Sequence, residues 1–247
     1  LVPSSRYHNN KDLMSFPNIG GPELEEKSII PLPHKDLTIK KRIFKAVQEK
    51  DVLLHFPYQS YNHIIDLLRE ASIDPKVRSI KITLYRLAQE SNVINALVNA
   101  ARNGKYVTVF LELQARFDEQ ANIEYAGRLQ RRGVKIIQSI PGFKVHSKLL
   151  LISRRDRDTQ QHIAYIGTGN FNESTARIYS DISLLTANSK IIEDVKKVFE
   201  LFDSNYTLFK FDQLLVSPFS TRKSFMKLIE KEISNHKAGK DAYIHIK

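Results

Sequence analysis

The sequence predicts an α/β fold built on a mixed, mostly parallel sheet flanked by helices. Two observations carry this prediction. Between residues 39 and 140, short apolar runs alternate with segments of helical periodicity, and after residue 143 two apolar runs follow each other across a short charged bend. Apolar runs separated by helices are typical of parallel strands covered on both faces, whereas a short bend predicts an antiparallel hairpin.

The first half of the chain reads as alternating elements after a lead-in. Residues 1–35 are rich in Pro, Gly and polar residues, which favours extended chain over a folded unit. Helices are expected at 39–50, 61–72, 92–102 and 122–132, and strands at 51–56, 77–85, 106–113 and 134–140. Pro75, Gly104 and Gly133 stop three of these helices. In such a sheet, function is expected at the carboxyl ends of the strands.

The second half departs from this alternation. Strands at 144–153 and 161–168 form the predicted hairpin, and a short helix at 174–178, a strand at 181–186 and a helix at 191–202 complete the unit. A connector at 204–220 leads to a helix at 224–236 and to strand-like alternation at 241–247. We therefore divide the chain into a lead-in (1–35), a folded unit (36–203) and a carboxyl-terminal segment (204–247).

Composition limits the class of protein. The 247 residues are 42% hydrophobic, enough for a sizeable core, and contain no cysteine, which excludes disulfides and thiolate metal sites. No apolar run is long enough to cross a bilayer, so a cytoplasmic protein is the default expectation. A formal net charge of +11 indicates an anionic partner: nucleic acid, a membrane surface or a phosphate-rich substrate.

His146 and Lys148 are the first candidate site residues. They lie two apart on a predicted strand, so both are expected on one face together with Lys144. A histidine in an apolar strand is more often structural, but three basic groups facing a core without an anion carry a heavy desolvation cost. A bound phosphate removes that cost, and a neutral imidazole could then accept a phosphoryl group.

A Gly-Thr-Gly-Asn turn at residues 167–170 follows the hairpin. Such turns more often connect elements than bind phosphate, but this one stands behind the His-x-Lys strand. Backbone amides around the two glycines can approach a phosphate, and Asn170 can orient the imidazole or donate to a phosphate oxygen.

Arg86 and Arg116 follow the strands at 77–85 and 106–113. Two guanidinium groups at neighbouring strand ends can clamp a polyanion. Surface salt bridges explain them equally well, since Asp118 and Glu119 are available as partners. Those carboxylates can alternatively hold Mg²⁺ through water.

Other candidates are weaker. His55 ends a strand and can reach the same edge, with a structural role as plausible, and His162 is expected to pack in the sheet. The pairs Arg131-Arg132 and Arg154-Arg155 are most simply solvated helix and hairpin ends. No zinc spacing, Walker loop, GxSxG elbow or kinase signature set is present, which disfavours a conventional nucleotide-binding fold.

Taken together, these motifs resemble a known family. His146-Ser-Lys148 followed by GTGN resembles the half-site of the phospholipase D superfamily, and HFPYQSY, IKITLYR, VTVFLELQARFDE and GTGNFNESTARIYSD resemble polyphosphate kinases of the long, histidine-phosphorylated type over residues 7–247. The acidic residue that the superfamily places five positions after the lysine is Ser153 here. This departure disfavours a phospholipase or nuclease.

The resemblance implies a phospholipase D-like fold and reversible transfer of the terminal phosphate of ATP to polyphosphate, with Mg²⁺ and a phosphohistidine. His146 matches the phosphorylated histidine, Arg86 and Arg116 match arginines of the magnesium and phosphate region, and Tyr179 matches a nucleotide-binding tyrosine. A guanidinium is no ordinary metal ligand, so both arginines are read as holding phosphate oxygens beside the metal. Lys148 and Asn170 are added as catalytic residues from their chemistry.

The same resemblance makes residues 36–203 a first catalytic half-domain and residues 204–247 a connector helix with the opening strand of a second. We expect the chain to be a middle piece of a longer enzyme and weakly active or inactive alone. Its expected partners are ATP, polyphosphate, the rest of the parent chain and further copies of the full-length protein, with no specific nucleic acid. The expected location is cytoplasmic, with membrane association open. Two alternatives remain: a phospholipase D-like phosphodiesterase acting as a homodimer, and a non-enzymatic module that binds polyanions or nucleic acid.

Overall fold

The computed structural model of the 247-residue chain describes residues 13, 16–26, 30–37, 41–85, 91–112, 119–138, 144–204 and 209–246. The chain divides into two units, Leu1–Ile30 and Pro31–Lys247. The described part of the first contains a single-turn 3-10 helix, η2 (Pro22–Leu24), which buries none of its residues. The second unit holds the sheet.

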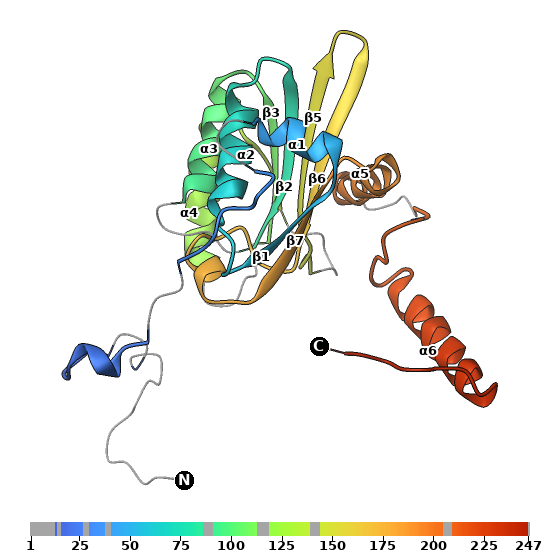
Figure 1. Cartoon of the computed structure of the whole chain (residues 1–247). Coiled ribbons are helices and arrows are strands. Elements are labelled where there is room, and N and C mark those ends of the chain that lie inside the picture. Colours follow the sequence, from blue (N-terminus) through green and yellow to red (C-terminus); the bar gives the residue numbers. More distant parts are fainter. Residues whose placement is uncertain are drawn as a thin grey trace. The chain divides into compact units, whose positions relative to one another are not determined.

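A seven-stranded mixed sheet forms the centre of the second unit, in the order β1-β7-β6-β5-β2-β3-β4 (Figure 1). Its strands are β1 (Val52–Phe56), β2 (Val77–Leu84), β3 (Tyr106–Leu111), β4 (Lys135–Gln138), β5 (Lys148–Asp156), β6 (Thr159–Gly167) and β7 (Asp181–Thr186). The pairs β2-β3 and β3-β4 are parallel, and the pairs β2-β5, β5-β6, β6-β7 and β7-β1 are antiparallel.

The prediction of a mixed sheet flanked by helices is confirmed. Five strands run in one direction and only β5 and β7 oppose them, but these two alternate with others, so most neighbouring pairs are antiparallel. "Mostly parallel" is therefore right for strand direction and wrong for hydrogen-bonded neighbours. The physical reason is the insertion of the β5-β6 hairpin and β7 between β1 and β2, which the local alternation of helices and strands does not reveal.

Helices cover both faces of the sheet (Figure 1). The two faces of β5 show this, because Leu150 and Ile152 belong to the core cluster that includes α1, α2 and α3, whereas Leu149 and Leu151 belong to the cluster of α5. Alternate strand residues point to opposite faces, so β5 is buried on both. The helices are α1 (Ile43–Glu49), α2 (Asn62–Ile73), α3 (Asn92–Arg102), α4 (Glu119–Gln130), α5 (Ser189–Asp203) and α6 (Thr221–Lys237).

The end of the predicted lead-in pairs with the folded unit, whereas α6 in the carboxyl-terminal segment buries none of its residues. Leu32 forms a parallel bridge with Gln59, so residues from 31 onward join the second unit rather than the lead-in. Helix α6 buries none of its residues, and residues 241–246 are not assigned to a strand. Because a strand is defined by its pairing partner, the predicted opening strand of a second domain stays a prediction. Among the helices of the described residues, none combines the length and apolarity needed to cross a membrane.

Candidate active site

The candidate site lies at one end of the sheet, where several strands bring their termini together. Lys148, the first residue of β5, pairs with Gly167 at the end of β6, and Gly167 pairs with Ser183 near the start of β7. On the other side of β5, Leu150 pairs with Ile82 near the end of β2. The carboxyl ends of β2, β3 and β6 thus surround the point where β5 begins, in agreement with the expected location of function.

His146 lies just before β5, in the irregular segment 144–147, and not within a strand as predicted. The residue is exposed, but its ring packs edge-on against the ring of Tyr85, with centroids 5.3 Å apart and planes at 77°. Partial burial of the ring is the largest cause that lowers the pKa of His146, followed by the charges of Lys148 and Lys144. The imidazole is therefore mainly neutral at pH 7, the form that can act as a nucleophile.

Lys148 is buried, with 5% of its surface exposed. Burial lowers its pKa to about 8, and the negative charge of Asp181 opposes this shift. Its Nζ donates to the backbone oxygen of His146 and lies 5.5 Å from the centroid of the Tyr85 ring. At pH 7 most Lys148 side chains still carry a proton, so a buried positive charge lies directly beside the imidazole. Such a charge favours a nearby anion.

The predicted common face of Lys144, His146 and Lys148 is wrong, because only Lys148 belongs to the strand. Lys144 and His146 are exposed, whereas Lys148 is buried. The physical cause is that the Thr83 side chain, rather than a backbone partner, bonds to the chain just after His146. The grouping of cations around the imidazole nevertheless holds, since both lysines lower its pKa.

The Gly-Thr-Gly-Asn turn follows β6 directly. The Oδ1 atom of Asn170 is buried and has no hydrogen-bond partner within the described residues. A buried acceptor without a donor costs about 1–3 kcal/mol, so a site ligand or a movable side chain that donates would be stabilising. An amide oxygen accepts from an N–H group and not from a phosphate oxygen. Both roles predicted for Asn170 stay predictions, and the unpaired oxygen is available to a donor such as an imidazole N–H.

Asp181 is a site residue that the sequence analysis did not single out. Its Oδ1 accepts from Thr168 Oγ1 at 2.8 Å, and Thr168 Oγ1 accepts in turn from the Ile182 amide at 3.0 Å. A Cβ atom at Gly169 would collide with the Asp181 carboxylate, which explains why glycine suits this position of the turn. The only sequence signal for Asp181 is an acidic residue at the first position of a predicted strand.

Glu173 ties the segment after the turn to another element. Its Oε1 accepts from the amides of Asn92 at 2.6 Å and Val93 at 3.2 Å, and the Ser91 hydroxyl donates to the same carboxylate at 3.3 Å. A carboxylate at a helix amino terminus satisfies otherwise unpaired amides. The turn is thereby fixed to the start of α3, which begins six residues after Arg86 in the sequence.

Three further residues at the strand ends were also missed: Thr83, Tyr85 and Glu112. Thr83 and Glu112 are 4% and 2% exposed. A hydroxyl or carboxylate at or just beyond the end of a strand is a weak signal, because a sequence does not show which strand ends are covered. All three contact residues 144–149.

Arg86 and Arg116 lie outside the described residues, as does Asp118, so their predicted roles stay predictions. Tyr179 is described. It lies two residues before β7 and is 62% exposed. Its backbone amide donates to Thr175 O at 3.0 Å. Its role in nucleotide binding stays a prediction.

Of the weaker candidates, His55 is exposed on β1, with its Nε2 3.5 Å from the Ser180 hydroxyl. His162 packs in the sheet as predicted: its Nδ1 lies 3.0 Å from Ser153 Oγ, and burial lowers its pKa. Ser153 thus bonds within the sheet instead of supplying an acidic group.

The two arginine pairs have different environments. Arg131 and Arg132 are exposed, as predicted for a helix end. The prediction of a solvated hairpin end is wrong for Arg154, whose side chain is 12% exposed and pairs with buried Asp74 at 3.0 Å. Cross-strand packing of β5 against β2 creates this pair, which sequence proximity does not reveal.

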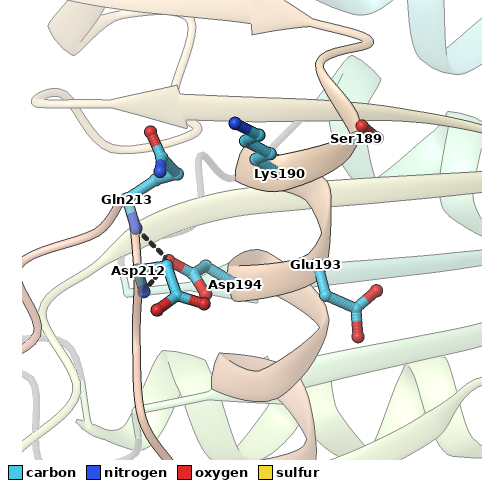
Figure 2. Close-up of a pocket in the computed structure, with 6 residues that line it drawn as sticks. All are labelled: Ser189, Lys190, Glu193, Asp194, Asp212 and Gln213. Atoms are coloured by element: carbon cyan, nitrogen blue, oxygen red, sulfur yellow. Dashed lines mark hydrogen bonds between the residues drawn. The ribbon is translucent and has the colours of Figure 1, made fainter.

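The described residues do not by themselves form a magnesium site, since among them no three His, Asp or Glu side chains are grouped to hold a metal ion. Nor does the described hollow beside α5 belong to the candidate site. It is lined by Ser189, Lys190, Glu193, Asp194, Asp212 and Gln213 (Figure 2), and none of the described site residues is among them. Figure 2 shows that the Asp194 carboxylate accepts from the amides of Asp212 and Gln213, at 2.8 and 2.6 Å. The hollow thus reflects the docking of the connector on α5.

Comparison with known proteins gives the family. A family model described as polyphosphate kinase C-terminal domain 1 matches residues 42–208. The chain belongs to this family. A curated polyphosphate kinase of Vibrio parahaemolyticus is 50% identical over the whole chain, and that of Escherichia coli strain K12 is 47% identical. The chain spans 36% of the length of each.

One solved structure agrees with this assignment to the polyphosphate kinase family. The crystal structure of polyphosphate kinase from Porphyromonas gingivalis superposes with a TM-score of 0.83 and 42% identity, covering 96% of this chain and 40% of that chain. A more distant neighbour is a phospholipase D family member, Nuc from Salmonella typhimurium, with a TM-score of 0.48, 16% identity and coverage of 64% of this chain and 93% of that chain.

Proposed function

We propose that this chain carries the phosphate-accepting half of a polyphosphate kinase centre, in which His146 takes the terminal phosphoryl group of ATP and passes it to polyphosphate. The observation that carries the proposal is the pairing of a mainly neutral imidazole with a buried lysine at the strand ends, in a chain of the polyphosphate kinase family. A nucleophile beside a fixed cation is what in-line phosphoryl transfer requires.

The proposed reaction has two balanced steps. In the first, an imidazole nitrogen of His146 bonds to the terminal phosphorus of ATP while the bond from that phosphorus to the bridging oxygen breaks, and ADP leaves with the electron pair. In the second, a terminal oxygen of polyphosphate attacks the same phosphorus and the phosphorus–nitrogen bond breaks. His146 is then regenerated and the polymer is one phosphate longer.

Lys148 supports both steps electrostatically. Its ammonium is held in a site of low polarity next to His146, where a fixed positive charge stabilises the negative charge that develops on phosphate oxygens. Asn170 can accept the N–H of the imidazole and so present the other ring nitrogen to phosphorus.

The remaining roles come from the family resemblance and complete the proposal. Arg86 and Arg116 would hold phosphate oxygens, and the exposed ring of Tyr179 would contact the nucleotide base. Mg²⁺ would enter bound to phosphate oxygens and water, because the described side chains do not form a cage for it. None of the steps above is assigned to the ion. ATP, polyphosphate, the rest of the parent chain and other copies of the full-length protein are the proposed partners.

The test is labelling of the full-length protein that contains this chain. Incubation with γ-labelled ATP and Mg²⁺ should give protein-bound label that is lost in acid and stable in alkali, the behaviour of a phosphohistidine. His146→Ala should abolish this label. His236→Ala, which replaces an exposed histidine on α6, should keep it and serves as the matched control.

Three outcomes would contradict the proposal. Unlabelled wild-type protein that still binds polyphosphate would identify a binding module, and cleavage of a phosphodiester substrate by a dimer would identify a phosphodiesterase. Label retained by His146→Ala would place the acceptor elsewhere.

A further inference from the structure

The segment that carries His146 is held by side chains from two neighbouring strands. Thr83, next to last in β2, is buried, and its hydroxyl donates to Ser147 O at 2.7 Å. The Thr83 Oγ1 atom also accepts a hydrogen bond from the Leu149 amide at 2.9 Å. One hydroxyl therefore satisfies a backbone acceptor and a backbone donor immediately after His146.

Glu112 holds the other side of His146. It directly follows β3 and is 2% exposed, and its Oε2 accepts from the Val145 amide at 3.2 Å. Its own amide donates to Leu84 O at 3.1 Å, so the side chain starts from a backbone position fixed to β2. The backbone is thus bonded at residue 145 and at residues 147 and 149.

These contacts replace the regular ladder where it ends. The registered pairing of β2 with β5 extends to Ile82 opposite Leu150, and beyond this pair the Thr83 hydroxyl bonds to the incoming chain. A nucleophile on an exposed, irregular segment would otherwise sample many orientations, and ordering it during the reaction costs conformational entropy.

We propose that Thr83 and Glu112 are positioning residues that preorganise His146 for phosphoryl transfer through the backbone of residues 145–149. This inference rests on the proposed function for its kinetic consequence, but the restraint on the segment does not depend on it. Neither side chain needs to touch the substrate. Their effect is expected on the rate of His146 phosphorylation and not on the affinity for ATP.

Thr83→Val and Thr83→Ser form a matched pair. Valine keeps the branched shape without the hydroxyl, whereas serine keeps the hydroxyl. In the full-length protein, we expect Thr83→Val to slow single-turnover labelling of His146 at least tenfold while the Kd for ATP changes less than about twofold. Thr83→Ser should stay within about threefold of wild type. Equal rates for valine and wild type, equal losses for valine and serine, or a parallel loss of ATP affinity would overturn the inference.

Amide hydrogen exchange tests the restraint without reference to function. Thr83→Val should speed exchange at Leu149 at least tenfold, with exchange in β3 unchanged. Glu112→Met should do the same at Val145, whereas Glu112→Gln, which keeps an acceptor oxygen, should not. Unchanged exchange in both Thr83→Val and Glu112→Met would overturn the proposed restraint. If the variants show faster exchange but the wild-type protein takes no label from ATP, the proposed function is contradicted and the restraint on the segment stands.

Discussion

Cations with little exposed side-chain surface lie near both ends of β5, and the two ends differ in what neutralises their charge. Near the carboxyl end, Arg154 pairs with the Asp74 carboxylate at 3.0 Å, and Arg42 pairs with the same carboxylate at 2.7 Å. At the amino end, Lys148 has no carboxylate within ion-pair distance among the contacts of the described residues, and its pKa falls to about 8. A matched pair is satisfied by the fold itself, whereas an unmatched buried cation favours a ligand that brings the negative charge.

The pKa directions make the same distinction. Asp74 is buried, which opposes its ionisation, yet the Lys76 amide and the two guanidinium groups lower its pKa overall. For Lys148, burial lowers the pKa and the more distant Asp181 opposes this only in part. One end of the strand therefore carries a cation whose charge the fold neutralises, whereas the other carries the buried cation of the proposed anion site.

The largest expected effect on stability comes from removing the Asp74 carboxylate, which pairs with Arg154 and Arg42. Asp74→Asn should reduce the free energy of unfolding by roughly 3 kcal/mol, because it removes the buried carboxylate that pairs with both Arg154 and Arg42. The figure is at the lower end for buried pairs, since Arg42 is half exposed and Arg154 keeps Asp156 at 3.7 Å. Urea denaturation of this chain measures it.

The pH dependence of that loss provides a control. A folded-state pKa below the ordinary value of 3.8 means that Asp74 contributes stability above pH 3.8 and loses it as the pH falls through the folded-state pKa. The difference between wild type and Asp74→Asn should therefore shrink in acid. A constant difference from pH 7 to pH 3 would contradict the assignment. The labelling rate per folded molecule should not change.

Replacing Lys148, at the amino end of β5, should have the opposite effect: little change in stability and a large change in the labelling rate. Lys148→Met keeps the apolar stem and removes the buried charge, so the stability should stay within about 1 kcal/mol of wild type. The rate of His146 labelling should fall by about 10²–10³, the usual cost of removing one group that stabilises transition-state charge. Single-turnover kinetics of the full-length protein measure the rate. A large loss of stability with normal labelling would reverse the comparison.

The smallest expected effect is on the pH profile of kcat/KM, which reports the free enzyme. The neutral imidazole is the reactive form and its pKa is lowered, so the acidic limb should lie below pH 6.5. The charged form of Lys148 is lost as the pH rises through about 8, so activity should decline there, by up to about tenfold per pH unit. Lys148→Arg removes titration at this position and should remove that alkaline limb. A limb that persists in Lys148→Arg would assign it to another group.

Much of this molecule follows from local sequence. The apolar periodicity defines α2, α3, α5 and most strands because burial of one face or of both faces leaves a clear pattern. The His-x-Lys pair followed by a Gly-Thr-Gly-Asn turn identifies the candidate site because its chemistry requires neighbouring residue types in one segment. His162 and the β5-β6 hairpin were predicted for the same local reasons.

Only the tertiary structure determined which distant residues meet. The insertion of β5 and β6 beside β2 made most pairings antiparallel, placed Arg154 against Asp74, and brought Thr83 and Glu112 to the two sides of His146. The same packing makes Lys148 the first residue of β5, so that His146 lies outside the strand. Local sequence encodes periodicity and reactive groups, but strand order depends on the packing of the whole sheet. Among the described residues, that packing decides that Arg154 pairs with a carboxylate and that Lys148 does not.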